Sequence, residues 1–331
     1  MKDKIRWGIL STAKIGREKV IPGLQKSNHC QVVAIASRSI EQARSTAELL
    51  NIEKAYGSYE ELLNDSKIEA IYIPLPNNMH VEWAIKSLQA GKHVLCEKPI
   101  GISAEESVKL QKVSNEYPHL KIMEAFMYHF HPQWQKVKSI IDENIVGEVK
   151  TIHSFFSYYN ADPTNIRNKT DMNGGALMDI GCYCISFPRF IFDAEPVRAL
   201  GIMDFDPKMK TDRITSGILD FSNGITSTFT CSTQLMPYQR VHIVGTEGRI
   251  EIEIPVNAPI NAASHIWVHT KNNSEEIIIE PVDQYTLQGD YFSEAILNDA
   301  EIQYSLNDTI GNMKVIDAIV ESAEKDTWVK L

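Results

Sequence analysis

The first part of the chain alternates short apolar runs with stretches whose apolar positions recur at helical spacing. This alternation is typical of a parallel sheet whose strands are joined by crossover helices. Strands are expected at residues 5–10, 32–37, 70–74, 93–96 and 121–126. We therefore predict an α/β N-terminal Rossmann domain, a doubly wound parallel sheet, over residues 1–127.

Helix boundaries in this region carry capping signals. In the capping box, a hydroxyl and a side chain three residues later satisfy free backbone N–H groups at a helix start. Three pairs fit this pattern: Ser39 with Gln42, Ser58 with Glu61, and Ser103 with Glu106. Gly91 stands directly before the strand expected at 93–96, where a helix C-cap belongs.

From about residue 150 the pattern changes to β-branched or aromatic segments of alternating polarity, separated by turns. Strands are expected at residues 149–159, 199–205, 215–221, 226–233, 240–244 and 249–254. Ser222-Asn223-Gly224 and Gly245-Thr246-Glu247-Gly248 are hairpin signals, which indicate antiparallel pairing. With late helices at about 285–298 and 307–324, residues 128–331 are predicted to form an α+β domain with a large open, mainly antiparallel sheet.

Composition limits the classes of partner and environment. The 331 residues include 33 Lys and Arg against 43 Asp and Glu, and a net charge of −10 argues against a nucleic-acid partner. No apolar run is expected to span a membrane. The start Met1-Lys2-Asp3-Lys4 leads into the first strand without a signal-peptide pattern, and 5 cysteines do not suggest a disulfide framework. A cytoplasmic location is therefore expected.

A candidate phosphate-binding turn follows the first strand. Ser11-Thr12-Ala13-Lys14-Ile15-Gly16 occupies the place of the usual G-x-G-x-x-G, with small residues at two of the three glycine positions. An ordinary strand–helix turn is the alternative. The segment nevertheless follows a strand and opens a helix in the first βαβ unit, where a pyrophosphate would be bound. Contacts to the cofactor are predicted from Ser11, Thr12, Ala13, Lys14 and Ile15.

The end of the second strand indicates which nucleotide is accepted. Sites selective for NAD carry Asp or Glu there to hold the ribose 2′-hydroxyl, whereas this chain has Ser37 followed by Arg38. A hydroxyl and a guanidinium can bind a 2′-phosphate through charge-assisted hydrogen bonds, which a carboxylate would oppose. NADP is therefore predicted over NAD, unless Arg38 is an ordinary surface charge.

Longer motifs resemble a known family. They are Pro74-Leu75-Pro76-Asn77-Asn78-Met79-His80, Ala90–Pro99 with Glu97-Lys98-Pro99, Gly174–Tyr183, and the turn at residues 245–248. Together they resemble the glucose-fructose oxidoreductase / inositol dehydrogenase / rhizopine-catabolism (Gfo/Idh/MocA) family over essentially the whole chain. The segments Glu124–Met127, His131–Gln133 and Asn165–Arg167 are most similar to its branch of NADP-dependent xylose and dihydrodiol dehydrogenases.

The resemblance implies a cofactor-binding first domain, a second domain for substrate binding and oligomerisation, and substrate between them. It implies pairing through the sheet, as a homodimer or homotetramer. The cofactor-binding residues it implies beyond the turn are Pro74, Leu75, Asn77, His80, Glu97 and Lys98. The chain departs from the family's pattern at His129, where Arg is expected, and at Tyr183, where inositol dehydrogenases carry His.

Alcohol oxidation needs a group that takes the hydroxyl proton while the cofactor takes the hydride. Tyrosine is a poor base at its usual pKa near 10, and a nearby ammonium favours the phenolate. We predict Lys98 as the polarising cation, Tyr183 as the general acid/base, and Asp179, four residues earlier on the same helical face, as an orienting carboxylate. The alternatives are a surface lysine, a packed aromatic ring, and a capping or ion-paired aspartate.

The motifs around several other residues are less specific, so their predicted roles at the site have alternatives. Asn165 and Arg167 are predicted on the substrate side with Asp179 and Tyr183, the alternative being exposed loop residues. His80 could equally be a helix-start residue. The histidines and cysteines at 129, 131, 182 and 184 have a two-residue spacing that does not suit a metal on one helical face, so no metal is expected. A cis Lys98–Pro99 bond is a further hypothesis.

These features predict an NADP(H)-dependent oxidoreductase that transfers hydride between the nicotinamide and a sugar, diol or related carbonyl. Its partner would be a small polyol or carbonyl. One alternative is a nucleotide-sugar ketoreductase. Another is a non-catalytic, cofactor-sensing regulatory protein, against which the presence of Lys98, Asp179 and Tyr183 argues, because a sensor does not need proton-handling groups.

Overall fold

The computed structural model describes residues 4–331. Residues 1–3, which begin the N-terminal stretch considered above, lie outside the described part. The chain divides into a first unit, Met1–Met127 with Asp283–Ile310, and a second unit, Tyr128–Val282 with Gly311–Leu331. The sequence places a single division after residue 127. Residues 283–310, which the sequence assigns to the second domain, pack instead with the first.

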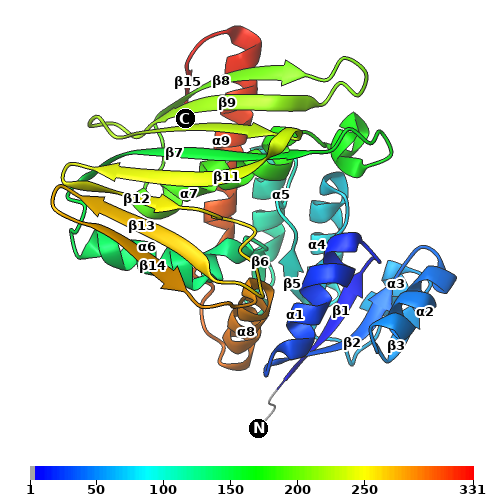
Figure 1. The fold of residues 1–331 in the computed structure, drawn as a ribbon. Coiled ribbons are helices and arrows are strands. Elements are labelled where there is room, and N and C mark those ends of the chain that lie inside the picture. Colours follow the sequence, from blue (N-terminus) through cyan, green and yellow to red (C-terminus); the bar gives the residue numbers. More distant parts are fainter. Residues whose placement is uncertain (1–3) are drawn as a thin grey trace. The chain divides into compact units, whose positions relative to one another are not determined.

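Parallel pairing organises the sheet of the first unit (Figure 1). Over the described residues it has six strands in the order β3-β2-β1-β4-β5-β6, and every recorded pair is parallel. The strands are β1 Ile5–Leu10, β2 Cys30–Ala36, β3 Lys54–Tyr56, β4 Ala70–Ile73, β5 His93–Cys96 and β6 Ile122–Glu124. Only β3, three half-buried residues at the sheet edge, was not expected from the sequence.

Helices cover both faces of this sheet because alternate residues of a strand point to opposite sides. Trp7 packs on Phe292 of α8, with ring centroids 5.6 Å apart. At Gly8 a Cβ would meet Leu62 of α3 on the other side. The helices of this unit are α1 Ile21–Lys26, α2 Ile40–Leu49, α3 Tyr59–Leu63, α4 His80–Gln89, α5 Ala104–Ser114 and α8 Gln284–Leu297.

The predicted capping residues act as caps. Ser39, Ser58 and Ser103 accept the backbone N–H of the residue three positions later, at the starts of α2, α3 and α5. Gly91 follows α4 with a φ of +73°. These confirm the predicted helix boundaries.

Helix α8 joins the first unit through close backbone packing on α1. A Cβ on Gly23 of α1 would lie 2.8 Å from Cβ of Tyr285, and one on Gly289 of α8 would lie 2.4 Å from Leu24. Glycine at both positions therefore lets the two helices approach. This contact explains why residues 283–310 belong with a sheet formed far earlier in the chain.

The second unit is built on a mixed sheet. Among its described residues nine strands run in the order β14-β13-β12-β11-β7-β10-β9-β8-β15. They are β7 Val149–Tyr159, β8 Arg198–Phe205, β9 Asp212–Asp220, β10 Thr226–Ser232, β11 Gln234–Gly245, β12 Gly248–Ile252, β13 Ser264–Thr270, β14 Ser274–Ile279 and β15 Val329–Lys330. Pairing is antiparallel, as predicted, except that β10 runs parallel to β7. Strands β13, β14 and β15 were not expected from the sequence.

Helices pack on one face of this sheet, as Figure 1 shows for α7 and α9. Ile152, Ser154 and Phe156 of β7 are buried on that face, whereas His153 between them is exposed on the other. At Gly201 of β8 a Cβ would meet the backbone of Ile319 in α9, so this helix lies directly on the strand. The remaining helices are α6 Pro132–Asp142, α7 Cys182–Phe192 and α9 Leu306–Lys325, the last starting in the first unit.

Within residues 4–331 one segment is apolar and long enough, by length and composition, to cross a membrane, contrary to the expectation from sequence. It is Thr170–Phe192, and 78% of its most apolar window is buried inside the protein. Packing against β7 and β10 of the sheet accounts for this apolarity.

His129 lies in the core of the second unit and is 2% exposed. Its Nε2 is 2.7 Å from the Tyr128 hydroxyl, which is 2.8 Å from Ser186 Oγ, and its ring stacks on Phe190. Burial lowers the pKa of His129 to about 3, helped by the positive charges of Arg189 and Lys138. The unexpected His129 is therefore a neutral core residue, held by an aromatic cluster.

Buried neutral histidines make stability depend on pH. The pKa of His129 is about 3 in the folded chain and 6.5 for a free histidine, and burial also lowers the pKa of His131 to about 4. Below pH 6.5 the unfolded chain binds protons that the folded chain does not. The contribution of these histidines to the free energy of unfolding is therefore complete above that pH. It is lost as the pH falls towards their pKa values in the folded chain.

We predict that His129→Gln flattens this acid dependence. The free energy of unfolding of the wild type should fall by about 1.4 kcal/mol per pH unit for each such histidine below its unfolded pKa. Urea unfolding between about pH 4.5 and 7 measures the slope. His119→Gln, at an exposed position, should keep the wild-type slope, and equal slopes in the two variants would contradict the assignment.

Candidate active site

The predicted cofactor-binding residues of the first unit gather at one edge of its sheet. Because β1, β2, β4 and β5 are parallel, the turns that follow them lie at their shared carboxyl ends. The chain order reverses between β1 and β4, and open α/β sheets bind ligands at such a point. The sequence predicted each of these four turns as part of the cofactor site.

Ser11 shapes the candidate phosphate-binding turn. Its φ of +116° lies in a region that normally favours glycine. Its hydroxyl donates to the Pro74 carbonyl at 3.0 Å and accepts the Ala13 N–H at 3.2 Å. The first glycine of the usual motif is thus replaced by a serine whose side chain ties the turn to the end of β4. Thr12, Ala13 and Ile15 are partly exposed and Lys14 is exposed.

At the end of β2, Ser37 is buried and Arg38 is exposed. Ser37 Oγ accepts the Ser39 N–H at 3.3 Å and lies 3.5 Å from Gln42 Oε1. The hydroxyl of Ser37 therefore supports the local turn. The guanidinium of Arg38 is the exposed cationic group beside it, and no carboxylate occupies the position that selects NAD.

The segment after β5 carries Glu97 and Lys98, both partly exposed. Glu97 Oε1 accepts a 2.6 Å hydrogen bond from the hydroxyl of Tyr72, a fully buried residue of β4. Burial and the negative charge of Glu97 raise the pKa of Tyr72, so the phenol remains a donor. The Lys98–Pro99 bond is cis, as predicted. Tyr72 was not expected at the site, because in the sequence it is one more position of a buried apolar strand.

His80 fastens two of these turns together. It is 1% exposed, and its ring nitrogens lie 2.8 Å from the Pro99 carbonyl oxygen and 2.7 Å from that of Leu75. The ring thus bridges the segment after β4 and the segment after β5, beside the partly exposed Asn77. A direct contact of His80 with the nicotinamide stays a prediction.

Glu124 supports the same segment from β6. It is 6% exposed; Oε1 accepts the Ile100 N–H at 2.8 Å, and Oε2 accepts the Thr309 hydroxyl. The backbone just beyond Lys98 and Pro99 is therefore held from two sides, by His80 and by Glu124.

In the second unit, Asp179 and Tyr183 lie at the start of the long buried helical segment. Asp179 is in a π-helical turn, η6 Leu177–Gly181, which leads directly into α7. The wide turn differs from the regular helix assumed from the four-residue spacing, and such turns are frequent at functional sites. Tyr183 is 4% exposed, with its ring 6.0 Å from that of Tyr128 and 6.1 Å from that of Phe156.

Two glycines fix the entry to this turn. Gly175 has a φ of +121°, and a Cβ there would lie 1.9 Å from Asp212 Oδ1. Asp212, buried in β9, accepts the Leu177 N–H at 2.8 Å, and burial raises its pKa. At Gly174 a Cβ would lie 2.3 Å from the Arg167 carbonyl oxygen. The Gly-Gly pair is therefore required for the close approach of two other segments.

The Asp179 carboxylate is held by two side chains of the same unit. Tyr158 donates its hydroxyl to Oδ2 at 2.5 Å, and Arg167 Nε lies 2.9 Å from Oδ1. The structure brings together Asp179 and Arg167, both of which the sequence assigns to the substrate side. Tyr158 was not expected at the site, because its position in a strand shows only that it alternates with exposed residues.

Asn165 is used locally. Its Oδ1 accepts the Arg167 N–H at 3.1 Å and caps the short helix η4 Ile166–Asn168, which is followed by η5 Thr170–Met172. A role of Asn165 in substrate binding stays a prediction. Within residues 4–331 no group of three or more His, Cys, Asp or Glu side chains could hold a metal ion.

Family models match both parts of the chain. Residues 5–124 match the oxidoreductase family with an NAD-binding Rossmann fold, and residues 134–251 match the GFO/IDH/MocA C-terminal domain. An uncharacterized oxidoreductase of Rhizobium meliloti is 41% identical, covering 98% of this chain and 99% of the relative. A D-xylose 1-dehydrogenase (NADP(+)) of Haloferax volcanii is 35% identical, with coverage of 98% and 99%.

Solved structures share the fold. A 3-ketoreductase from Actinomadura kijaniata, in complex with NADP and TDP-benzene, superposes with a TM-score of 0.91 at 26% identity, covering 97% of this chain and 98% of that chain. The similarity thus extends over both units, including the parallel sheet and the mixed sheet. The chain belongs to the GFO/IDH/MocA family of oxidoreductases.

Proposed function

We propose that this protein is an NADP(H)-dependent oxidoreductase that moves a hydride between the nicotinamide and a sugar, a diol or a related carbonyl. The observation that carries the proposal is the exposed Arg38 after buried Ser37, at the carboxyl end of β2 in a Rossmann sheet. The similar xylose dehydrogenase is named for NADP, which supports this choice of cofactor.

The residues of the first unit fit a dinucleotide. The turn from Ser11 to Ile15 supplies small residues and backbone N–H groups for the pyrophosphate, and Arg38 would hold the 2′-phosphate. Pro74, Leu75 and Asn77 would line the nicotinamide end with Glu97. When bound, the nicotinamide supplies the hydride acceptor or donor.

The protein itself must position the substrate and handle its proton. In our proposal Lys98 polarises the substrate oxygen, Tyr183 transfers its proton, and Asp179 orients the reacting groups. Solved variants of the similar ketoreductase include one with a tyrosine replaced by phenylalanine and others with a lysine replaced by alanine or glutamate. The two residue types varied there, a tyrosine and a lysine, are those to which we assign proton handling.

A nucleotide-sugar ketone is the second candidate substrate. It is favoured by the fold match to a ketoreductase that binds TDP-benzene and by the 27% identity to a dTDP-sugar 3-reductase of the same organism over 95% of this chain. A screen of aldoses, diols and dTDP-ketosugars with NADP and NADPH, followed at the nicotinamide absorbance band, separates the two candidates. It also separates an enzyme from a sensor.

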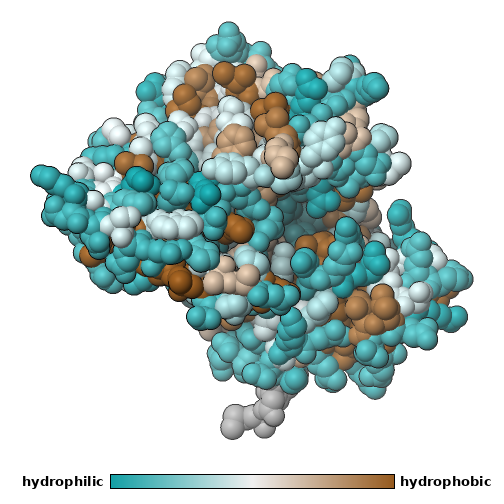
Figure 2. Space-filling view, viewed as in Figure 1, coloured by the Kyte–Doolittle hydropathy of each residue, from teal (hydrophilic) through white to brown (hydrophobic). Residues whose placement is uncertain are grey.

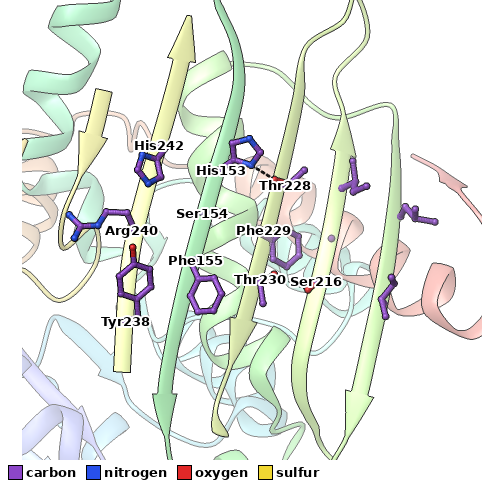
Figure 3. Close-up of a pocket in the computed structure, with 14 residues that line it drawn as sticks. His153, Ser154, Phe155, Ser216, Thr228, Phe229, Thr230, Tyr238, Arg240 and His242 are labelled. Atoms are coloured by element: carbon purple, nitrogen blue, oxygen red, sulfur yellow. Dashed lines mark hydrogen bonds between the residues drawn. The ribbon is translucent and has the colours of Figure 1, made fainter. Parts of the chain in front are cut away.

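We also propose that copies of the chain pair through the open face of the mixed sheet, as a homodimer or homotetramer. Figure 2 shows hydrophobic surface over β8 and β9, where Ile202 is 72% and Ile218 37% exposed. Figure 3 shows His153, Phe155, Arg240 and other side chains standing on this face around a hollow of about 480 Å³. Exposed apolar surface of this kind marks an association site.

We propose that the protein is located in the cytoplasm and that it has neither a membrane nor a nucleic-acid partner. All five cysteines of the chain are buried thiols, which agrees with a reducing compartment.

Cofactor choice gives the first test of this proposal. Arg38→Ala should weaken NADP binding by about 1–3 kcal/mol, the scale of a charged hydrogen bond, and leave NAD binding nearly unchanged. Fluorescence titration measures both affinities. Arg6→Ala, at the amino end of β1 on the opposite edge of the sheet, is the control and should change neither. Equal wild-type affinity for the two cofactors would refute the NADP assignment.

The proton-transfer roles give the second test. Tyr183→Phe should keep cofactor affinity and lower kcat by about 10²–10⁴-fold, the usual contribution of a general acid/base. Lys98→Met should lower kcat comparably, and the double variant should be little worse than either single one, because the residues act as a unit. Near-normal turnover in Tyr183→Phe would show that Tyr183 is a packed aromatic residue and not the general acid/base.

Association gives the third test. Ile202→Arg should convert the oligomer to monomers, because it places a charge in the proposed interface. Leu49→Arg, at a position of the first unit that is 68% exposed, should not. Sedimentation velocity measures the mass of both variants, and a monomeric wild type would exclude the interface.

A further inference from the structure

Each oxygen of the Asp179 carboxylate has a side-chain partner within the second unit. The hydroxyl of Tyr158 donates to Oδ2 at 2.5 Å, and the guanidinium Nε of Arg167 lies 2.9 Å from Oδ1. The Asp179 side chain is only 12% exposed. A carboxylate so placed can neither rotate freely nor exchange its partners for water without breaking one of these two contacts.

The chemistry of these partners favours the charged form of the carboxylate. Hydrogen bonds donated to a carboxylate and a neighbouring positive charge both stabilise the anion, whereas burial alone would favour the neutral acid. Burial and the negative charge of Asp179 raise the pKa of Tyr158, so its phenol stays protonated. Tyr158 is therefore a permanent donor to Asp179 and is unsuited to act as a base.

The three side chains come from separate elements. Tyr158 is near the end of β7, which is paired on both sides in the middle of the sheet, and Asp179 is in the π-helical turn η6. Arg167 is in η4, whose backbone is tied to that turn by the Gly175 N–H, which donates to the Arg167 carbonyl at 2.7 Å. The titratable groups that face Tyr158 in this unit are Asp179, Arg167 and Cys231 of β10.

We propose that Tyr158 is a positioning residue that, with Arg167, holds Asp179 as a fixed anion four residues before Tyr183. This rests on the proposed function, in which Asp179 orients the reacting groups. A side chain of β7, itself held by the sheet, thereby sets both the charge and the direction of the carboxylate. Tyr158 contacts Asp179 and acts through it.

The neighbouring tyrosine supplies a matched control. Tyr159 is 68% exposed and, as the next residue of the strand, points to the opposite face of the sheet. Tyr158→Phe removes one hydroxyl and keeps the ring, and Tyr159→Phe makes the same change away from Asp179. Any difference between the two variants therefore reports the hydrogen bond to Asp179.

A ¹³C NMR titration of the Asp179 carboxyl tests the inference without requiring activity. The titration midpoint should move to higher pH by about 1–2 units in Tyr158→Phe, the equivalent of one charged hydrogen bond, and stay at the wild-type value in Tyr159→Phe. An identical midpoint in the two variants would overturn the proposal. This result is independent of the proposed function, because the titration can be measured even if the wild type shows no turnover.

Kinetics provides the second readout. Tyr158→Phe should lower kcat/KM by about 10- to 100-fold, keep NADP affinity, and move the acidic limb of the pH profile upward. In an Asp179→Asn background the Tyr158→Phe change should have little further effect, because both act through one carboxylate. If Tyr158→Phe lowered kcat/KM by the same factor in the Asp179→Asn background, the role of Tyr158 would be merely structural. A lower melting temperature of Tyr158→Phe with an unchanged acidic limb of the pH profile would lead to the same conclusion.

Discussion

Parallel pairing is the constraint on which the candidate cofactor site depends. Because β1, β2, β4 and β5 run in one direction, the turns after them meet at one edge, although they come from residues as far apart as Ser11 and Lys98. Polar contacts then join the segments at the ends of β1, β4 and β5: Ser11 with the Pro74 carbonyl, Tyr72 with Glu97, and His80 with the carbonyls of Leu75 and Pro99. The strand direction brings the turns together, and these hydrogen bonds lock them.

The second unit uses buried polar groups in a comparable way. Asp212 accepts from Leu177 N–H and from the Thr215 hydroxyl, and so holds the first turn of the helical segment that carries Asp179. Arg189 forms a two-pronged ion pair with Glu195 further along the same segment. A buried polar group without partners is costly, so each of these groups specifies one arrangement of the segments around it.

The mixed sheet serves two purposes because its faces differ. On β7, alternate residues such as Phe156 and Tyr158 face the helical segment, and those between them face the open side. A single strand therefore contributes to the proposed proton-transfer site with one set of side chains and to the proposed oligomer interface with the other. This division follows from the two-residue period of a strand.

Local signals in the sequence determined much of the protein. Capping serines, hairpin turns and alternating polarity act over a few residues, so they predicted most strands and the helix starts. Tertiary structure alone decided the parallel pairing of β10 with β7, the packing of residues 283–310 on α1, the neutral core position of His129 and the contact of Tyr158 with Asp179. These depend on groups that are distant in the chain, and a linear pattern carries no information on which distant partner a buried side chain will meet.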